Sequence, residues 1–323
     1  MALRLAIGIA LIGVLLWAGL LDLDVLAGAL RHPFLLLAAL LVLFATLLVA
    51  ALRWHVLLRV QQIRLPKITT LRVVLASSFF SAFLPGALGG DLLRSGYMVR
   101  AAHGRASTGL LSIVMDRVLG LAGLLAVSTL VAVAHPRHIP QPVAAALLAT
   151  VLALGCAAFA LPRILRALAH RVPPSARSWR AALAKSMREL NTAITTYRRA
   201  NTAIAAGLLL SMLVCVLDVA GLLLVMHAMG IDALPWMQQA LACTLALIAN
   251  NLPFTPGGLG IGETAFANAA LMLEPSHTGA PYATAFLAYR CMTILSTVPG
   301  AFVGMRLPPR RVPQSAQAPA RRA

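Results

Sequence analysis

Long uninterrupted apolar runs are the feature that most restricts what this chain can fold into. The hydrocarbon core of a bilayer is about 30 Å thick, and a helix needs roughly 20 residues to cross it. The runs are continuous, whereas the strands of a transmembrane barrel alternate between apolar and polar residues. The sequence therefore predicts an all-α integral membrane protein with six transmembrane helices, near Leu3–Leu21, Pro33–Leu52, Thr108–Ala134, Val143–Leu161, Ala203–Met229 and Ala283–Val303.

The composition supports this class. Of the 323 residues, 60% are hydrophobic and 11% are charged, whereas a soluble domain has about 25% charged residues. The net charge of +18 suits cytoplasmic loops that meet anionic lipid. Since no basic stretch carries interleaved aromatic residues, we expect no nucleic-acid partner. We interpret the first run, after Arg4, as a retained anchor because a signal-peptide core is usually shorter and a clean cleavage site is missing.

Two further apolar regions, Val73–Val99 and Trp236–Leu273, are interrupted by proline and glycine. Proline breaks the helical hydrogen-bond pattern, and glycine favours turns. Each region is therefore predicted to form a re-entrant helical hairpin whose turn lies at membrane depth. Such backbone is tolerated only where protein buries it or a water-filled cavity meets it. The predicted turn residues are Pro85, Gly86, Gly89 and Gly90 in the first hairpin and Pro256, Gly257, Gly258, Gly260 and Gly262 in the second.

The distribution of the 27 Lys and Arg residues predicts the topology. Cytoplasmic loops carry an excess of these residues. If both termini are cytoplasmic and the two hairpins enter from opposite sides, 23 basic residues lie on the cytoplasmic side and only Arg31 and Arg137 lie outside. The 23 include Arg53, which we place in the basic loop after the second span. Arg117 and Arg290 remain within spans.

The two hairpins belong to an internal repeat. Each glycine turn ends in a carboxylate, Asp91 or Glu263, and an arginine follows 26 residues later at Arg117 and 27 residues later at Arg290. Because the hairpins enter from opposite sides, the repeats are inverted, one over about 33–134 and the other over about 203–304. Interrupted helices in inverted repeats are typical of secondary transporters. The alternative is that the small residues serve only close helix packing.

These elements form a single membrane domain over residues 1–305. The connection 162–201 is predicted to be an amphipathic helix on the cytoplasmic lipid surface, with a solvated linker helix as the alternative. The basic tail, residues 306–323, is rich in Pro, Ala, Gln and Arg, and is predicted to be disordered.

Ionisable residues at membrane depth cost about 2.5–3.5 kcal/mol each, so they normally face a cavity or a partner. Guanidinium groups match the geometry of phosphate, which makes Arg117 and Arg290 candidates for holding a phospholipid or polyprenyl-phosphate head group. Asp91 and Glu263 would balance these arginines in the empty site, or one would carry a proton. The alternative is that both carboxylate–arginine pairs are permanent and fix the packing of the helices. The candidate substrate-binding residues are Asp91, Arg94, Asp116, Arg117, Glu263 and Arg290.

Asp116 has a simpler alternative role as the local partner of an arginine. Asp218 has no counterpart in the first repeat, and we interpret it as a polar contact between helices. The histidines lack the spacing of metal ligands, and the four cysteines lie in apolar runs without paired spacing. The sequence also lacks a nucleophile elbow, a zinc-binding helix motif and a phosphate-binding loop. We therefore expect no metal, no cofactor and no enzymatic activity.

Four motifs in fixed order carry a family resemblance: FLPGALGGDLLR at Phe83–Arg94, MDRVLGL at Met115–Leu121, LPFTPGGLGIGE at Leu252–Glu263 and AYR at Ala288–Arg290. Over about residues 5–305 the chain resembles the flippase-like transmembrane region of lysylphosphatidylglycerol synthases. The resemblance implies a bacterial inner-membrane protein that moves or handles a lipid, and the analogy suggests a homodimer. We expect a stand-alone member without the cytoplasmic synthase domain, so aminoacyl transfer is not inherited. Other relatives are associated with glycolipid, hopanoid or cardiolipin pathways, which leaves the lipid open.

Three functions follow as hypotheses. The leading one is a lipid translocator for an anionic head group. The second is an accessory protein that anchors a separate lipid-modifying enzyme or glycosyltransferase through the basic segment Arg163–Arg199. The third is a small-solute secondary transporter, which a sealed central cavity would favour and a lateral opening would oppose.

Overall fold

The computed structural model describes residues 27–83, 89–101, 106–134, 139–170, 188, 191–192, 194–231, 234–250, 261–274 and 281–304. These residues are mostly helical and contain no strand, which confirms the all-α prediction. Several predictions fall outside the described residues, namely the first span, the turn residues Pro85, Gly86, Pro256, Gly257, Gly258 and Gly260, most of the linker 162–201, and the tail. The labelled helices are α3 (Pro33–Val60), α4 (Lys67–Phe83), α5 (Gly89–Ala101), α6 (Ala106–Ala134), α7 (Gln141–His170), α9 (Asn201–Ala228), α10 (Trp236–Asn250), α11 (Ile261–Leu273), α12 (Tyr282–Thr297) and α13 (Pro299–Gly304).

Within the described residues, four helical stretches are long and apolar enough to cross a membrane. They are Pro33–Val60, Thr108–Ala134, Asn201–Ala228 and Tyr282–Val303, and each overlaps one of the predicted spans. Large apolar side chains on their outer faces are exposed, as Phe34 of α3 and Leu209 of α9 illustrate. Such surfaces are stable against hydrocarbon and not against water. The protein is therefore a multi-pass membrane protein.

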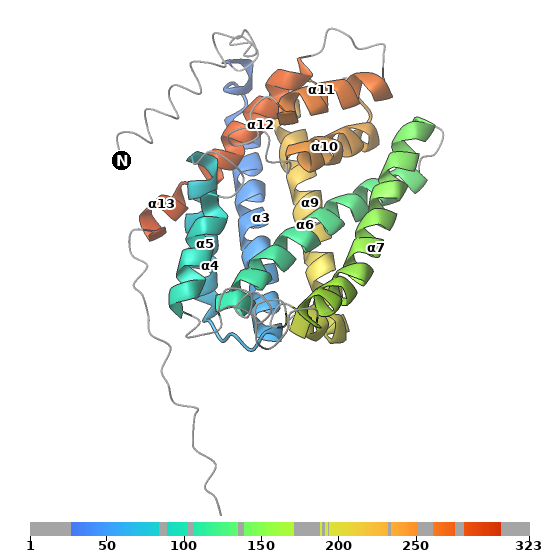
Figure 1. The fold of residues 1–323 in the computed structure, drawn as a ribbon. Coiled ribbons are helices and arrows are strands. Elements are labelled where there is room, and N and C mark those ends of the chain that lie inside the picture. The colour runs from blue at the N-terminus through green and yellow to red at the C-terminus, as the bar shows by residue number, and fades with distance from the viewer. Residues whose placement is uncertain are drawn as a thin grey trace, which may run out of the picture.

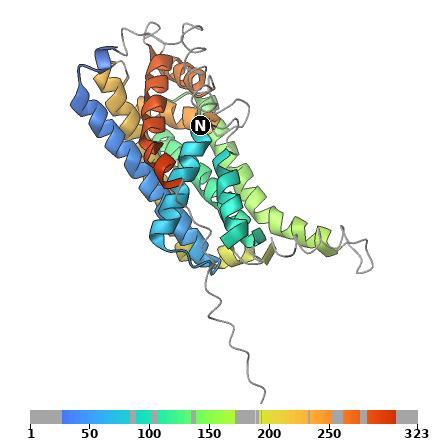
Figure 2. The ribbon, with the colours of Figure 1, turned by 90° about the vertical axis from the view of Figure 1, so that its left-hand side faces the viewer.

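Helices α3 and α9 form a long antiparallel pair (Figure 1), and the turned view shows this pair along one side of the molecule (Figure 2). The register is antiparallel because Leu43 of α3 lies against Gly221 of α9, whereas Arg53, further along α3, hydrogen-bonds Ser211, which comes earlier in α9. A Cβ atom at Gly221 would lie 2.6 Å from Cδ2 of Leu43, so glycine is what permits the close approach at this point. This pair sets the positions of the shorter helices at its two ends.

The shorter helices pack in two pairs, α4 with α5 and α10 with α11. Helix α4 follows the C-terminal end of α3, and α10 follows the C-terminal end of α9. Since α3 and α9 are antiparallel, the two pairs lie toward opposite ends of the bundle, as both views show (Figures 1 and 2). In the first pair the backbones touch, because a Cβ atom at Gly90 of α5 would clash with the carbonyl oxygen of Ser77 in α4.

The largest hydrophobic core joins α9, α10, α11 and α12 with parts of α3 and α6. Its centre is aromatic: Phe266 of α11 stacks on Phe286 of α12 with ring centroids 5.5 Å apart, and Tyr289 lies 5.4 Å beyond Phe286. Buried aromatic side chains contribute large contact areas. This core therefore fixes α11 and α12, the helices that carry Glu263 and Arg290.

Candidate functional site: a charged cavity between the helix pairs

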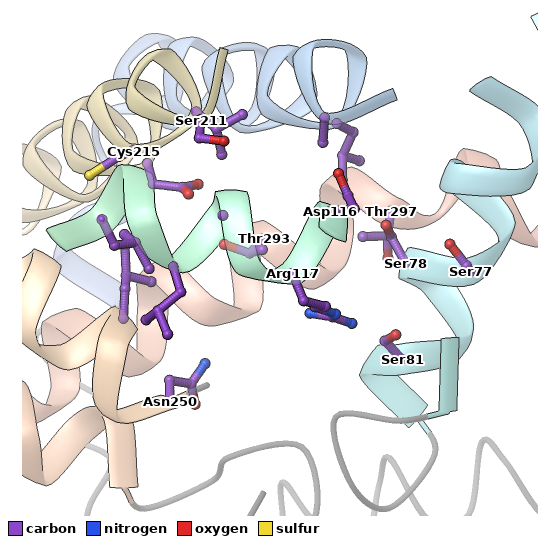
Figure 3. A pocket seen from close by; sticks show the side chains of 18 of the residues that line it. Ser77, Ser78, Ser81, Asp116, Arg117, Ser211, Cys215, Asn250, Thr293 and Thr297 are labelled. Atoms are coloured by element: carbon purple, nitrogen blue, oxygen red, sulfur yellow. The ribbon is translucent and has the colours of Figure 1, made fainter. Parts of the chain in front are cut away.

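One cavity of about 420 Å³ lies among the described helices, a size typical of ligand sites in proteins. Its lining comes from α3, α4, α5, α6, α9, α10 and α12. Figure 3 shows Arg117 of α6 facing the same space as Ser81 of α4 and Thr293 of α12. The lining includes five of the six candidate binding residues: Asp91, Arg94, Asp116, Arg117 and Arg290. The sixth, Glu263, is the ion-pair partner of Arg290.

The first pair predicted from the repeat is formed. Arg117 donates from Nε to Oδ2 of Asp91 at 3.0 Å and from Nη2 to Oδ1 at 3.1 Å, so the contact is bidentate. Asp91 lies in the first turn of α5, where the helix dipole favours a negative charge. The Arg117 side chain is 47% exposed, so the cavity reaches the molecular surface beside this residue.

The second pair repeats this arrangement with less exposure. Arg290 of α12 donates from Nη1 to Oε1 of Glu263 at 3.0 Å, and Glu263 lies in the first turn of α11. Both side chains are largely buried. A guanidinium group has five N–H donors, and the hydrogen bond described here between Arg290 and Glu263 uses one of them.

A third charged cluster is formed by one carboxylate and two arginines. Asp116 of α6 accepts from Nε of Arg53 at 2.7 Å and from Nη1 of Arg94 at 3.0 Å, and all three side chains are buried. Arg53 also donates to the Ser211 hydroxyl at 2.9 Å and Arg94 to the Ser77 hydroxyl at 2.8 Å. With one negative and two positive side chains, the cluster carries a formal charge of +1 on the cavity wall.

The position of Arg53 corrects a prediction. We had placed this residue in a cytoplasmic basic loop after Leu52, but α3 continues to Val60 and Arg53 lies on its buried face. The physical reason is that Asp116 and Ser211 supply the partners that a buried guanidinium needs. The sequence held one indication that Arg53 continues the helix, since Leu47, Ala50 and Arg53 recur at helical spacing. In the structure all three residues line the cavity.

Asp218 and Tyr289 also belong to the site, although the sequence did not place either among the candidate binding residues. Asp218 of α9 lines the cavity, and the Tyr289 hydroxyl of α12 hydrogen-bonds its carboxylate, so it is a contact between helices, as predicted, and also part of the site. Tyr289 directly precedes Arg290, as Asp116 directly precedes Arg117. The residue before the cavity arginine therefore differs between α6 and α12, an aspartate in one and a tyrosine in the other. Among the described residues, no group of three or more His, Cys, Asp and Glu is placed to hold a metal ion.

Comparison with known proteins then decides the family. The family model described as the lysylphosphatidylglycerol synthase TM region matches residues 1–304. The chain belongs to this family. The resemblance inferred from the four ordered motifs is thus confirmed, and it covers the spans, both helix pairs and the cavity. No curated protein and no solved structure matches the chain. Membership of the lysylphosphatidylglycerol synthase TM region family connects this membrane domain to lipid handling.

Proposed function

We propose that this protein moves lipids with an anionic head group between the leaflets of the membrane. One observation carries the proposal: two equivalent carboxylate–arginine pairs, Asp91–Arg117 and Glu263–Arg290, meet at the same cavity. Packing alone explains glycines at the close helix contacts, but it does not require a carboxylate–arginine ion pair at matching positions in both repeats.

The chemistry of the cavity favours a phosphate-containing head group. Arginine forks bind phosphate in a bidentate geometry, and the cluster of Arg53, Arg94 and Asp116 adds a formal positive charge nearby. A volume of about 420 Å³ suits a head group and not a whole lipid, so the acyl chains would stay in the bilayer. The exposure of Arg117 favours a lipid that enters sideways over a small solute held in a sealed cavity.

The proposed topology has six transmembrane helices and two re-entrant hairpins in an inverted repeat. The hairpins would be α4–α5, entering from the cytoplasm, and α10–α11, entering from outside. The antiparallel α3 and α9 and the location of the hairpins at opposite ends of the bundle support this arrangement. In this proposal both termini lie in the cytoplasm, the membrane is the bacterial inner membrane, and the cavity binds and releases lipid without a chemical step.

The test is head-group exposure in proteoliposomes. Fluorescent phosphatidylglycerol in the inner leaflet becomes accessible to an impermeant quencher once it reaches the outer leaflet. The double variant Arg117→Ala/Arg290→Ala should lose most of the protein-dependent rate. A matched control, Arg59→Ala/Arg188→Ala, removes two exposed arginines outside the cavity and should keep it. A folded Arg117→Ala/Arg290→Ala variant that moves lipid at the wild-type rate would refute the proposal.

A charge exchange separates substrate binding from a purely structural ion pair. The variant Asp91→Arg/Arg117→Asp keeps one positive and one negative group in contact, yet it moves the guanidinium from α6 to α5. If the pair only holds the helices together, this variant retains lipid movement. If Arg117 binds the head group, the variant folds and loses lipid movement, which is the result we expect.

A further inference from the structure

Within the described part of the chain, Asp218 is the one acidic side chain in the cavity lining without an arginine partner. Among the residues that the structure describes, Asp91 and Asp116 each form ion pairs within 4 Å, as does Glu263 behind Arg290. Asp218 instead accepts a hydrogen bond from the Tyr289 hydroxyl. It lies in the middle of α9, a candidate membrane span, where an ionised carboxylate without a counter-ion is costly.

Groups on every helix packed against α9 surround this carboxylate. Among the described residues, the titratable and charged side chains that face it or share its cavity are Arg53 of α3, Asp91 and Arg94 of α5, Asp116 and Arg117 of α6, Cys215 of α9 itself, Cys243 of α10, and Tyr289 and Arg290 of α12. Of these, the arginines of α6 and α12 already have carboxylate partners, and Arg53 is paired with Asp116. Asp218 is therefore the carboxylate whose charge can change without breaking an ion pair.

The state of Asp218 that balances the charges of the site depends on whether an anionic head group is bound. Among the residues that the structure describes, the arginines of the site are Arg53, Arg94, Arg117 and Arg290, and its carboxylates are Asp91, Asp116, Asp218 and Glu263. The turn segments 84–88 and 251–260 contribute no ionisable side chain. With Asp218 ionised the empty site is neutral, and a phosphodiester head group would bring it to −1. Because an uncompensated charge in a low-dielectric site is costly, a proton on Asp218 restores neutrality.

We propose that Asp218 takes up one proton when an anionic head group enters the cavity, so that lipid and proton are moved together. The proposal rests on the function proposed above and adds its coupling ion. The balance is simple: the carboxylate becomes a carboxylic acid when the phosphodiester binds, and it releases the proton when the phosphodiester leaves. A lipid with one negative charge then crosses with no net charge, so a pH gradient drives the movement and a membrane potential does not.

Proton uptake on lipid binding tests the coupling directly. Short-chain phosphatidylglycerol is added to the detergent-solubilised full chain in a weakly buffered solution near neutral pH, with a pH indicator present. The wild type should take up about one proton for each lipid bound, as charge balance requires. Asp218→Asn should bind the lipid without proton uptake, and Asp218→Glu should restore the uptake. Glu274→Gln, which removes an acid at the end of α11 outside the cavity lining, should behave as the wild type.

Proteoliposomes supply the second readout. An imposed pH gradient should accelerate lipid movement by the wild type several-fold and leave Asp218→Asn unaffected. The coupling is overturned if the wild type binds lipid without proton uptake, or if Asp218→Asn takes up as many protons as the wild type. Neither result contradicts the proposed lipid movement. Absence of lipid binding by the wild type overturns the proposed function and the coupling together. If Asp218→Asn does not fold, the wild-type stoichiometry and Asp218→Glu decide the question.

Discussion

Removing Asp116 should destabilise the protein more than removing any other carboxylate of the cavity. This side chain is 3% exposed and is the shared partner of Arg53 and Arg94, at 2.7 and 3.0 Å. Breaking a buried ion pair by removing one partner costs about 3–5 kcal/mol, because the other charge stays buried without compensation. Asp116→Ala leaves two such charges, on the buried side chains of Arg53 and Arg94, so we expect a loss at the upper end of that range.

The matched control is Asp91→Ala. Asp91 also pairs with an arginine, but Arg117 is 47% exposed and its charge remains partly solvated when the partner is removed. Exposed pairs contribute only about 0.2–1 kcal/mol, so Asp91→Ala should cost about 1 kcal/mol. The measurement is the free energy of unfolding in mixed micelles, followed by circular dichroism for both variants under the same conditions.

A triple variant distinguishes two causes of destabilisation, a buried charge left without a partner and the loss of side-chain packing. Replacing the whole cluster by apolar residues of similar size, as Arg53→Met/Arg94→Met/Asp116→Leu, removes the buried charges together and should recover much of the stability lost in Asp116→Ala. Equal destabilisation by Asp116→Ala and Asp91→Ala, or a triple variant less stable than Asp116→Ala, would refute the reasoning.

Two further predictions concern packing and pH. Gly90→Ala should lower the free energy of unfolding by about 1–3 kcal/mol, because its Cβ atom would clash with the Ser77 carbonyl oxygen. Gly96→Ala, in open space on the same helix, should raise the free energy of unfolding by about 0.5–1 kcal/mol in the same assay. Equal effects of the two substitutions would contradict the close contact at Gly90. Burial raises the pKa of Tyr197, whose hydroxyl donates to the Leu57 carbonyl at 3.1 Å. The neutral hydroxyl therefore stabilises the fold below about pH 10, and this contribution is lost above it, where the unfolded tyrosine ionises. A pH titration of unfolding should show a shallower alkaline loss in Tyr197→Phe, and identical slopes would exclude this role.

The sequence by itself determined the class of protein and the pairing of the repeated charges. Hydropathy over about 20 residues is a local property, so the spans near Pro33, Thr108, Asn201 and Tyr282 were predictable to within a few residues at most of their ends. The ion pairs Asp91–Arg117 and Glu263–Arg290 were foreseeable as well. Charges at membrane depth need partners, and the carboxylate precedes the arginine by a similar interval in both segments, 26 and 27 residues. The roles of these residues in binding lipid remain predictions.

Only the tertiary structure decided which other charged side chains lie at the same cavity as these two ion pairs. Arg53 reaches Asp116 because α3 and α9 pack antiparallel in a register that places Arg53 beside Ser211, and no local pattern encodes that register. Asp218 meets Tyr289 for the same reason, across two helices that are far apart in the chain. Hydropathy ends a span at the first arginine, whereas the helix continues wherever a neighbouring helix supplies the partner that keeps that arginine buried.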